Sequence, residues 1–325
     1  MRQAVGALLA GAVCALFSSL ASAQSWAPTK PITIVVPVPP GSSTDMLARV
    51  LSERLPAALG QTVVVTNRPG ASGLIGASSV ARAEPDGHTL LLAASTVLGA
   101  PHVLPKGAGG GVDMIKDLSP VVITASSPLV ILANPGLGVK NVAELVAYAK
   151  AHPGLPYASS GNGSPQHVTG ELFQKSTGVE MTHVPYKGVM PAVMDTLSGQ
   201  IKVVFSALGG VGQYIDNGQL IAIAVMEKQR SSLLPKVPTL TESGVKGVEL
   251  NVFFPVFAPA GTPAPALQRL NQEINKVMQS PDVRERMLAA GVETRTASVD
   301  EATKEVTAEY SRYAQVVKEF GIKGE

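Results

Sequence analysis

The chain is poor in the residue types that carry several common chemistries. It has one cysteine, Cys14, so no disulfide can form within the chain and a cysteine-rich metal site is excluded. Only 1 Trp, 6 Tyr and 7 Phe are present, too few for an obvious base-stacking platform. Charged residues make up 15% and the net charge is +2, without a Lys/Arg-rich run. The sequence therefore does not favour nucleic-acid binding.

What the chain does contain is typical of a globular protein. Hydrophobic residues make up 45% of its 325 residues, enough to bury one large core or two. At about 150 residues per domain, this length suggests two domains. After the first residues, no apolar run is long enough to cross a bilayer, which needs about 20 residues.

Residues 1–23 have the pattern of an export signal. Arg2 supplies a positive start, residues 4–17 are apolar and uncharged, and residues 21–23 read Ala-Ser-Ala, as at a signal peptidase site. We predict export, cleavage near Ala23 and no stable membrane insertion afterwards. A retained membrane anchor is the alternative interpretation.

The first part of the remaining chain alternates strands and helices. Apolar, β-branched runs predict strands at 32–37, 63–65 and 89–94, and spaced apolar residues predict helices at 47–55 and 74–83. Pro56 is expected to end or kink the first of these helices. This β-α-β-α-β order implies a parallel sheet with right-handed crossovers. A Gly-rich stretch, residues 99–113, then breaks the pattern.

A second α/β run and two further strands follow. Helices are predicted at 141–151, 165–176, 189–198, 263–278, 281–290 and 299–319, and strands at 156–160, 181–185, 201–205 and 220–225. Residues 121–133 suggest one long strand that is interrupted at 126–128, a candidate hinge, and residues 253–259 suggest a second crossing strand.

These elements predict an α/β protein with two lobes. Each lobe would hold a parallel-rich sheet, and the two crossing strands would join the sheets, leaving a cleft where small ligands commonly bind. We expect lobe 1 to comprise residues 24–124 and 257–325, and lobe 2 residues 125–256.

Two loops at predicted strand ends share one physical design. Residues 39–45 and 159–165 are rich in Gly and hydroxyl side chains, and each precedes a helix. Gly41 lets the first loop turn closely, while Ser164 and Pro165 suit the start of the second helix. A helix start offers unpaired N–H donors and a partial positive charge, so each loop could hold an anion. Ordinary helix capping is the alternative. Neither loop has a nucleotide-binding spacing, which favours a carboxylate over a phosphate.

Other candidate residues carry weaker signals. His167 could contact a ligand or be a capping histidine, and Lys187 could face an anion or lie free on the surface. A triad using Ser164 and His167 lacks the G-x-S-x-G elbow, so catalysis is not expected. The five histidines show no H-x-x-x-H pair, so neither a metal site nor another cofactor is predicted.

Several stretches together give the chain a family resemblance. They are residues 30–32, 40–45, 67–71, 85–87, 160–164 with His167, 184–188, 237–239 and 258–263. In these stretches the chain resembles the tripartite tricarboxylate transporter solute receptors, or Bug family of periplasmic binding proteins. The resemblance implies a type II-like fold that closes on a small carboxylate between the two loops.

On this basis we predict a set of ligand-binding residues. They are Val38, Pro39, Gly41, Ser42, Ser43, Thr44, Asp45, Ser95, Ser160, Gly161, Gly163, Ser164, His167, Lys187 and Ser206. The chain departs from the family pattern at Ser42, where a second Gly is usual, and at Ser206, where Asp is common. Phe253 or Phe254 stands where a Trp is usual. These departures affect which ligand the protein can bind, and they disfavour a ligand whose ammonium group needs an acidic partner.

Three classes of function follow. The first is a periplasmic receptor, monomeric and without a cofactor, that delivers a small organic carboxylate to membrane transporter subunits. The second is a receptor that docks a membrane sensor protein. The third is an exported hydrolase. The identity of the carboxylate does not follow from the sequence.

Overall fold

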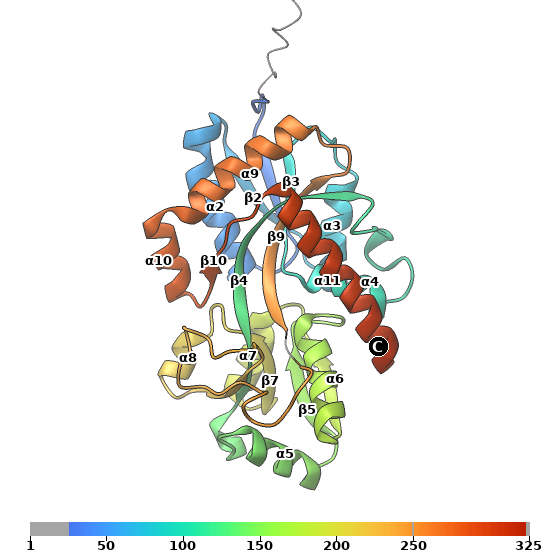
Figure 1. Ribbon diagram of the computed structural model, residues 1–325, viewed down its shortest axis with the longest axis vertical. Helices are drawn as coiled ribbons and strands as arrows, with labels where there is room; N and C mark the ends of the chain where they lie inside the picture. Colours follow the sequence, from blue (N-terminus) through green and yellow to red (C-terminus); the bar gives the residue numbers. More distant parts are fainter. Residues whose placement is uncertain (1–25, 249, 323–325) are drawn as a thin grey trace, which may run out of the picture.

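The computed structural model describes residues 26–248 and 250–322. The predicted export signal, residues 1–23, lies outside this range. Within it, no helix is both long and apolar enough to span a membrane. The described residues form two lobes, one above the other in Figure 1, joined by two long strands that run from one lobe to the other.

The upper lobe is built on a mixed sheet with the order β2-β1-β3-β9-β4. Its parallel strands are β1 (Ile32–Val36), β2 (Val63–Asn67) and β3 (Thr89–Leu92). The helices of this lobe are α2 (Ser43–Leu59), α3 (Leu74–Ala81), α4 (Thr96–Val103), α9 (Ala264–Gln279), α10 (Pro281–Ala289) and α11 (Val299–Phe320). The short strand β10 (Glu293–Thr294) pairs with β4.

The lower lobe repeats the α/β design. Its strands are β5 (Leu155–Ser159), β6 (Met181–Pro185), β7 (Val203–Ala207) and β8 (Ile221–Val225). Strand β5 lies parallel to both β6 and β7, while β7 and β8 pair antiparallel with β4. Helices α5 (Val142–Ala151), α6 (Pro165–Thr177), α7 (Val189–Ser198) and α8 (Gly212–Asp216) belong to this lobe.

The crossing strands are β4 (Leu118–Ala133) and β9 (Asn251–Pro259), which pair antiparallel from Leu118–Pro259 to Pro128–Asn251. They confirm the predicted two-lobed α/β fold with two connections. The predicted lobe boundaries at 124/125 and 256/257 fall inside these two strands and remain a proposal.

The predicted interruption of β4 at 126–128 was wrong, because the strand is continuous there. Its register shifts occur elsewhere, between Pro120 and Val122 and between Ile123 and Ala125 against β9, and between Ile131 and Leu132 against β8. The buried Ser127 fits a strand because its hydroxyl donates to the Gly291 carbonyl at 2.9 Å and accepts from the Gly209 N–H at 3.0 Å.

Two helix predictions also need correction. Helix α2 does not end at Pro56 but continues to Leu59, because a proline in the last turn removes a single helix hydrogen bond. Helix α4 begins before the Gly-rich stretch and includes its first five residues, 99–103, where the sequence predicts a break in the pattern. Its side chains Val97 and Leu98 are buried, so packing outweighs the low helix propensity of Gly99 and Pro101.

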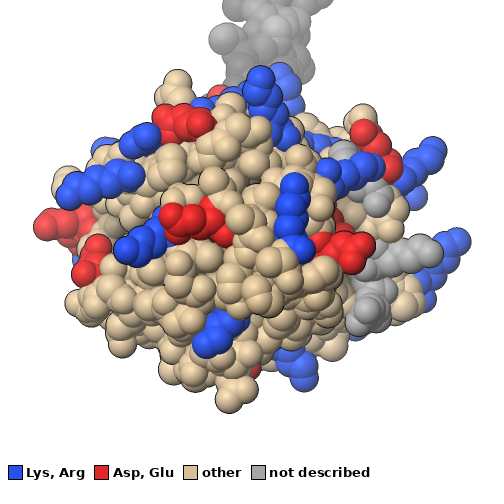
Figure 2. All heavy atoms as spheres, turned by 90° about the horizontal axis from the view of Figure 1, so that it is seen from below, with Lys and Arg blue, Asp and Glu red and all other residues tan. Residues whose placement is uncertain are grey.

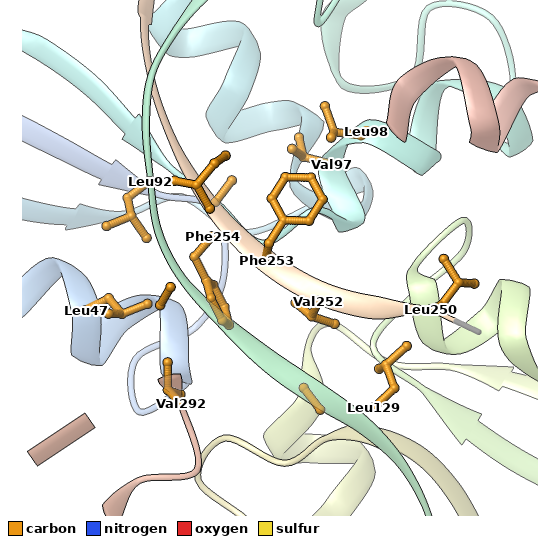
Figure 3. Packing of buried hydrophobic residues seen from close by; sticks show 14 of the residues in the cluster. Leu47, Leu92, Val97, Leu98, Leu129, Leu250, Val252, Phe253, Phe254 and Val292 are labelled. Atoms are coloured by element: carbon orange, nitrogen blue, oxygen red, sulfur yellow. The ribbon is translucent and has the colours of Figure 1, made fainter. Parts of the chain in front are cut away.

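The core continues along the crossing strands from one lobe toward the other. In Figure 3, Phe253 points from β9 toward Val97 and Leu98, while Phe254 points to the opposite side of the strand. Both phenylalanines are 2% exposed. Buried aromatic side chains therefore hold the backbone of β9 on both of its faces.

Candidate functional site

A cleft with a cavity volume of about 240 Å³ lies between the lobes. The crossing strands contribute Val252 and Phe254 to its lining. The remaining lining comes from loops and helix starts of both lobes. These residues are 37, 38, 42–44, 69–73, 94, 96, 97 and 104 of the upper lobe, and 160–162, 166, 185–190, 207 and 209 of the lower lobe.

The first predicted loop reaches this cleft as the start of α2. Ser42 is the N-cap, and its hydroxyl accepts a hydrogen bond from the Asp45 N–H at 3.2 Å. Within the described part of the chain, the N–H groups of Ser43 and Thr44 have no hydrogen-bond partner. These two donors, with the positive end of α2 behind them, suit an anion in the cleft.

Asp45 supports this loop and does not line the cleft. Its carboxylate accepts from the Gly41 N–H at 3.0 Å, from Arg49 Nε at 2.8 Å and from Asn67 Nδ2 at 3.0 Å. Burial alone would raise the pKa of Asp45, but these hydrogen bonds outweigh it and lower the pKa. Arg49 neutralises the carboxylate, so Asp45 fixes the turn at Gly41 without presenting a free negative charge beside the anion donors.

The second predicted loop connects β5 to α6. Ser164 caps α6, its hydroxyl accepting from the His167 N–H at 3.1 Å, and Pro165 occupies the first turn. Ser160 donates from its hydroxyl to Gln166 Oε1 at 3.0 Å. Ser160, Gly161 and Gln166 line the cleft, whereas Ser164 is fully buried beneath it.

A pair of stacked histidines supports this second loop from below. The rings of His167 and His183 lie 3.8 Å apart at 5°. His167 Nδ1 accepts from the Gly163 N–H at 3.1 Å, and His183 Nε2 lies 2.6 Å from the Ser159 hydroxyl. Burial lowers the pKa of His167 to about 3 and that of His183 to about 4, so both rings are neutral at pH 7. Their neutral nitrogens fix the loop that faces the cleft.

A third loop, residues 69–73, also faces the cleft and was not predicted as part of the site. Ala71 and Ser72 have φ of 46° and 50°, a left-handed conformation that costs energy for residues other than Gly. A methyl group at Gly161 would lie 3.0 Å from the Ser72 hydroxyl, so this loop meets the second loop across the cleft. In the sequence, Pro69-Gly70 indicates a turn here, but not that the turn faces the cleft.

The turn that leads into α7 contributes Tyr186 and Lys187. The Tyr186 hydroxyl donates to Asp195 Oδ2 at 2.6 Å. Burial and this carboxylate raise the pKa of Tyr186 to about 12, so the side chain presents a neutral ring to the cleft. Lys187 is the one charged side chain among the described lining residues.

The predicted site residues fall into two groups. Val38, Ser42, Ser43, Thr44, Ser160, Gly161 and Lys187 line the cleft, and Pro39 lines a groove beside it. The others are not among its lining residues: Gly41, Asp45, Ser95, Gly163, Ser164, His167 and Ser206. Asp45, Ser164 and His167 hold the two loops in place, so we propose a supporting role for them. Direct ligand contact stays a prediction for the residues that line the cleft.

Gly163, Ser95 and Ser206 each have a structural partner. A methyl group at Gly163 would lie 2.5 Å from Val103 and 2.9 Å from the Ala100 Cα, so Gly163 packs against α4 of the upper lobe. Ser95 Oγ accepts from the Phe253 N–H at 3.5 Å, and Ser206 donates to the Ala207 carbonyl at 2.8 Å.

The lining suits reversible binding of an anion. It combines backbone N–H groups, hydroxyls, amides and Lys187 with apolar surface from Val97, Val252 and Phe254. No Asp or Glu is among the described lining residues. Among the described residues, no three His, Cys, Asp or Glu side chains gather to hold a metal.

Comparison with known proteins agrees with this geometry. The model of the tripartite tricarboxylate transporter family receptor matches residues 47–322. Protein BugT of Bordetella pertussis is 38% identical over 299 residues, which are 91% of each chain. A Rhodopseudomonas palustris protein solved with adipate is 34% identical, with a TM-score of 0.86 over 91% of this chain and 99% of that one.

Two further solved structures have the same two-lobed form. The periplasmic binding protein BugD is 31% identical, with a TM-score of 0.85 over 92% of this chain and 100% of that one. MatC of Rhodopseudomonas palustris, solved with malate, is 29% identical, with a TM-score of 0.83 over 89% of this chain and 99% of that one. The relatives are binding proteins, which confirms the expectation of a receptor rather than an enzyme. The chain belongs to the tripartite tricarboxylate transporter receptor family and is a periplasmic solute-binding receptor of the Bug type.

Proposed function

We propose that this receptor binds a small organic carboxylate between its lobes and delivers it to the membrane subunits of a tripartite tricarboxylate-type transporter. The main support for this proposal is the position of the two loops. The starts of α2 and the β5–α6 loop come from different lobes and line the same cleft, where the described lining contains Lys187 and no acidic side chain.

Hydrogen bonds within each loop fix the positions of its N–H donors. Asp45 fixes the first loop through Gly41, and His167 fixes the second through Gly163. Donors that are already in place lose little conformational freedom on binding, so more of the interaction energy contributes to affinity. The structural neighbours with adipate and malate support a carboxylate as the bound group.

Calorimetric titration at pH 7 with hexanoate, adipate, hexanamide and hexan-1-ol tests the proposal. We expect one of the two acids to bind at least about 100-fold more tightly than the uncharged compounds, since charged hydrogen bonds contribute about 1.5–3 kcal/mol each. Lys187→Gln should weaken the acid, whereas Lys202→Gln, a substitution outside the cleft lining, should not. Equal binding of the amide, or no binding of either acid, would contradict the proposal.

Delivery to a transporter needs a separate measurement in the native host. Deletion of the gene should abolish uptake of the radiolabelled acid, and a wild-type copy should restore it. Uptake that is unaffected by the deletion would contradict the transport role and leave the binding role standing.

A further inference from the structure

A second groove continues outward from the cleft. It has a volume of about 250 Å³ and is lined by Val38, Pro39, Pro40, Ser42, Gly188, Val189, Met190, Pro191 and Met194. Five of these residues also line the cleft: Val38, Ser42, Gly188, Val189 and Met190. The two spaces therefore share walls, and we call the second one the outer groove.

The outer groove differs chemically from the cleft. Its lining is proline, valine and methionine apart from Gly188 and Ser42, and the Ser42 hydroxyl is used as the cap of α2. Pro39 and Pro40 approach from the upper lobe, while Pro191 and Met194 lie on α7 of the lower lobe.

Met194 is 53% exposed, so this methionine is not explained by packing in the core. Exposed apolar surface that continues a binding cleft marks a place for an apolar part of a ligand. Methionine side chains are flexible and polarisable, and they adapt to hydrocarbon of different shapes.

We propose that the outer groove holds the hydrocarbon tail of a ligand whose carboxylate lies in the cleft. This inference rests on the proposed function and narrows its ligand class to elongated acids with one carboxylate and an apolar body. Among the described residues that line the two spaces, Lys187 is the single cation and none is acidic. A second carboxylate in the outer groove would lack a charged partner there, and an ammonium group would lack one in both spaces.

The test is a calorimetric series of straight-chain acids from butanoate to decanoate at pH 7. Each methylene beyond hexanoate should tighten binding about two- to fourfold until the groove is filled, as expected for burial of apolar surface. Decanoate should also bind more tightly than sebacate, the diacid of the same length.

Two variants test whether the hydrocarbon tail lies in the outer groove. Met194→Gln should weaken decanoate binding by a larger factor than hexanoate binding, so that the gain from hexanoate to decanoate shrinks. Leu288→Gln is the matched control, because Leu288 is 48% exposed on α10 and lines neither space. It should bind both acids as the wild type does.

The outcomes separate this inference from the proposed function. If no acid binds, both the proposed function and this inference are contradicted. If hexanoate binds but longer acids gain nothing, or sebacate binds more tightly than decanoate, the inference is overturned and carboxylate binding stands. Equal loss of hexanoate and decanoate affinity in Met194→Gln also overturns it. A chain-length gain that Met194→Gln reduces supports it.

Discussion

Gly99→Ala tests whether the two lobes must touch for ligand to bind tightly. Gly99 lies on α4 of the upper lobe, and a methyl group there would be 2.1 Å from the carbonyl oxygen of Gly163 in the lower lobe. Because the Cβ and the carbonyl oxygen need a separation of roughly 3.3 Å, the lobes would have to move apart by about 1.2 Å at this point. The Tyr313 ring, 3.0 Å from the same methyl group, would have to move by a smaller amount.

The expected effect follows from these contacts. Overpacking of this kind costs about 1–3 kcal/mol, so affinity for the tighter of hexanoate and adipate should fall about 5- to 150-fold. Separated lobes avoid the contact with Gly163, and alanine in a helix interior is favoured over glycine by about 1 kcal/mol. The melting temperature without ligand should therefore change little.

The assay is calorimetry for affinity, small-angle scattering for the radius of gyration and differential scanning calorimetry for stability. Gly212→Ala is the matched control, because a methyl group there has nothing within 4 Å. Unchanged affinity in Gly99→Ala would show that the lobes bind ligand tightly without this contact, contrary to the prediction. A large loss of melting temperature would show that the contact with Tyr313 dominates instead.

Three further predictions concern the supports of the two loops. Ser164→Ala should lower the free energy of unfolding by about 1 kcal/mol in urea titrations, because it removes the N-cap of α6; unchanged stability would contradict the capping role. In the folded state, His167 and His183 have lower pKa values than in the unfolded chain. The contribution of the neutral rings to the free energy of unfolding is therefore complete above about pH 6.5. It is lost as the pH falls toward about 4 for His183 and about 3 for His167. Urea midpoints between pH 7 and 5 should show a loss of up to about 1.4 kcal/mol per pH unit for each ring, and His183→Gln should reduce this slope. Asp45→Ala should weaken acid binding about tenfold in calorimetry although Asp45 does not line the cleft, because the Gly41 N–H loses its hydrogen-bond acceptor. Wild-type affinity in this variant would show that the first loop keeps its conformation without Asp45.

Much of the fold could be predicted because its strands carry strong local patterns. The run at 32–36 is almost continuously apolar and becomes a buried strand, and helix α6 begins at the Ser164-Pro165 signal. Helix α4 was missed, since Gly99 and Pro101 lower its local propensity and its stability comes from packing with distant residues. The continuous β4 was missed for a related reason, because the partners of Ser127 are far along the chain.

The lining of the cleft could be predicted at the helix starts, but not where it depends on contacts between the lobes. Ser42 to Thr44 and Ser160 to Gly161 line the cleft as expected. Ser72 and Phe254 line it as well, yet only the folded chain places them there. The support that His183 gives the second loop could not be predicted, because it depends on stacking with His167 from another element.

The surface charge agrees with a small ligand rather than a polyanion. In the face shown in Figure 2, basic and acidic side chains are interspersed over largely uncharged surface. The net charge of +2 is correspondingly small. Ligand recognition is therefore expected to depend on local donors in the cleft and not on a long-range field.

A crystal structure of the protein with the tightest-binding acid of the series would show directly where the carboxylate binds. We expect it to lie in the cleft, within hydrogen-bond distance of donors from both lobes, including the Ser43 or Thr44 N–H and the loop at 160–162, directly or through one water. A carboxylate bound outside the cleft, or held by donors of one lobe alone, would contradict it.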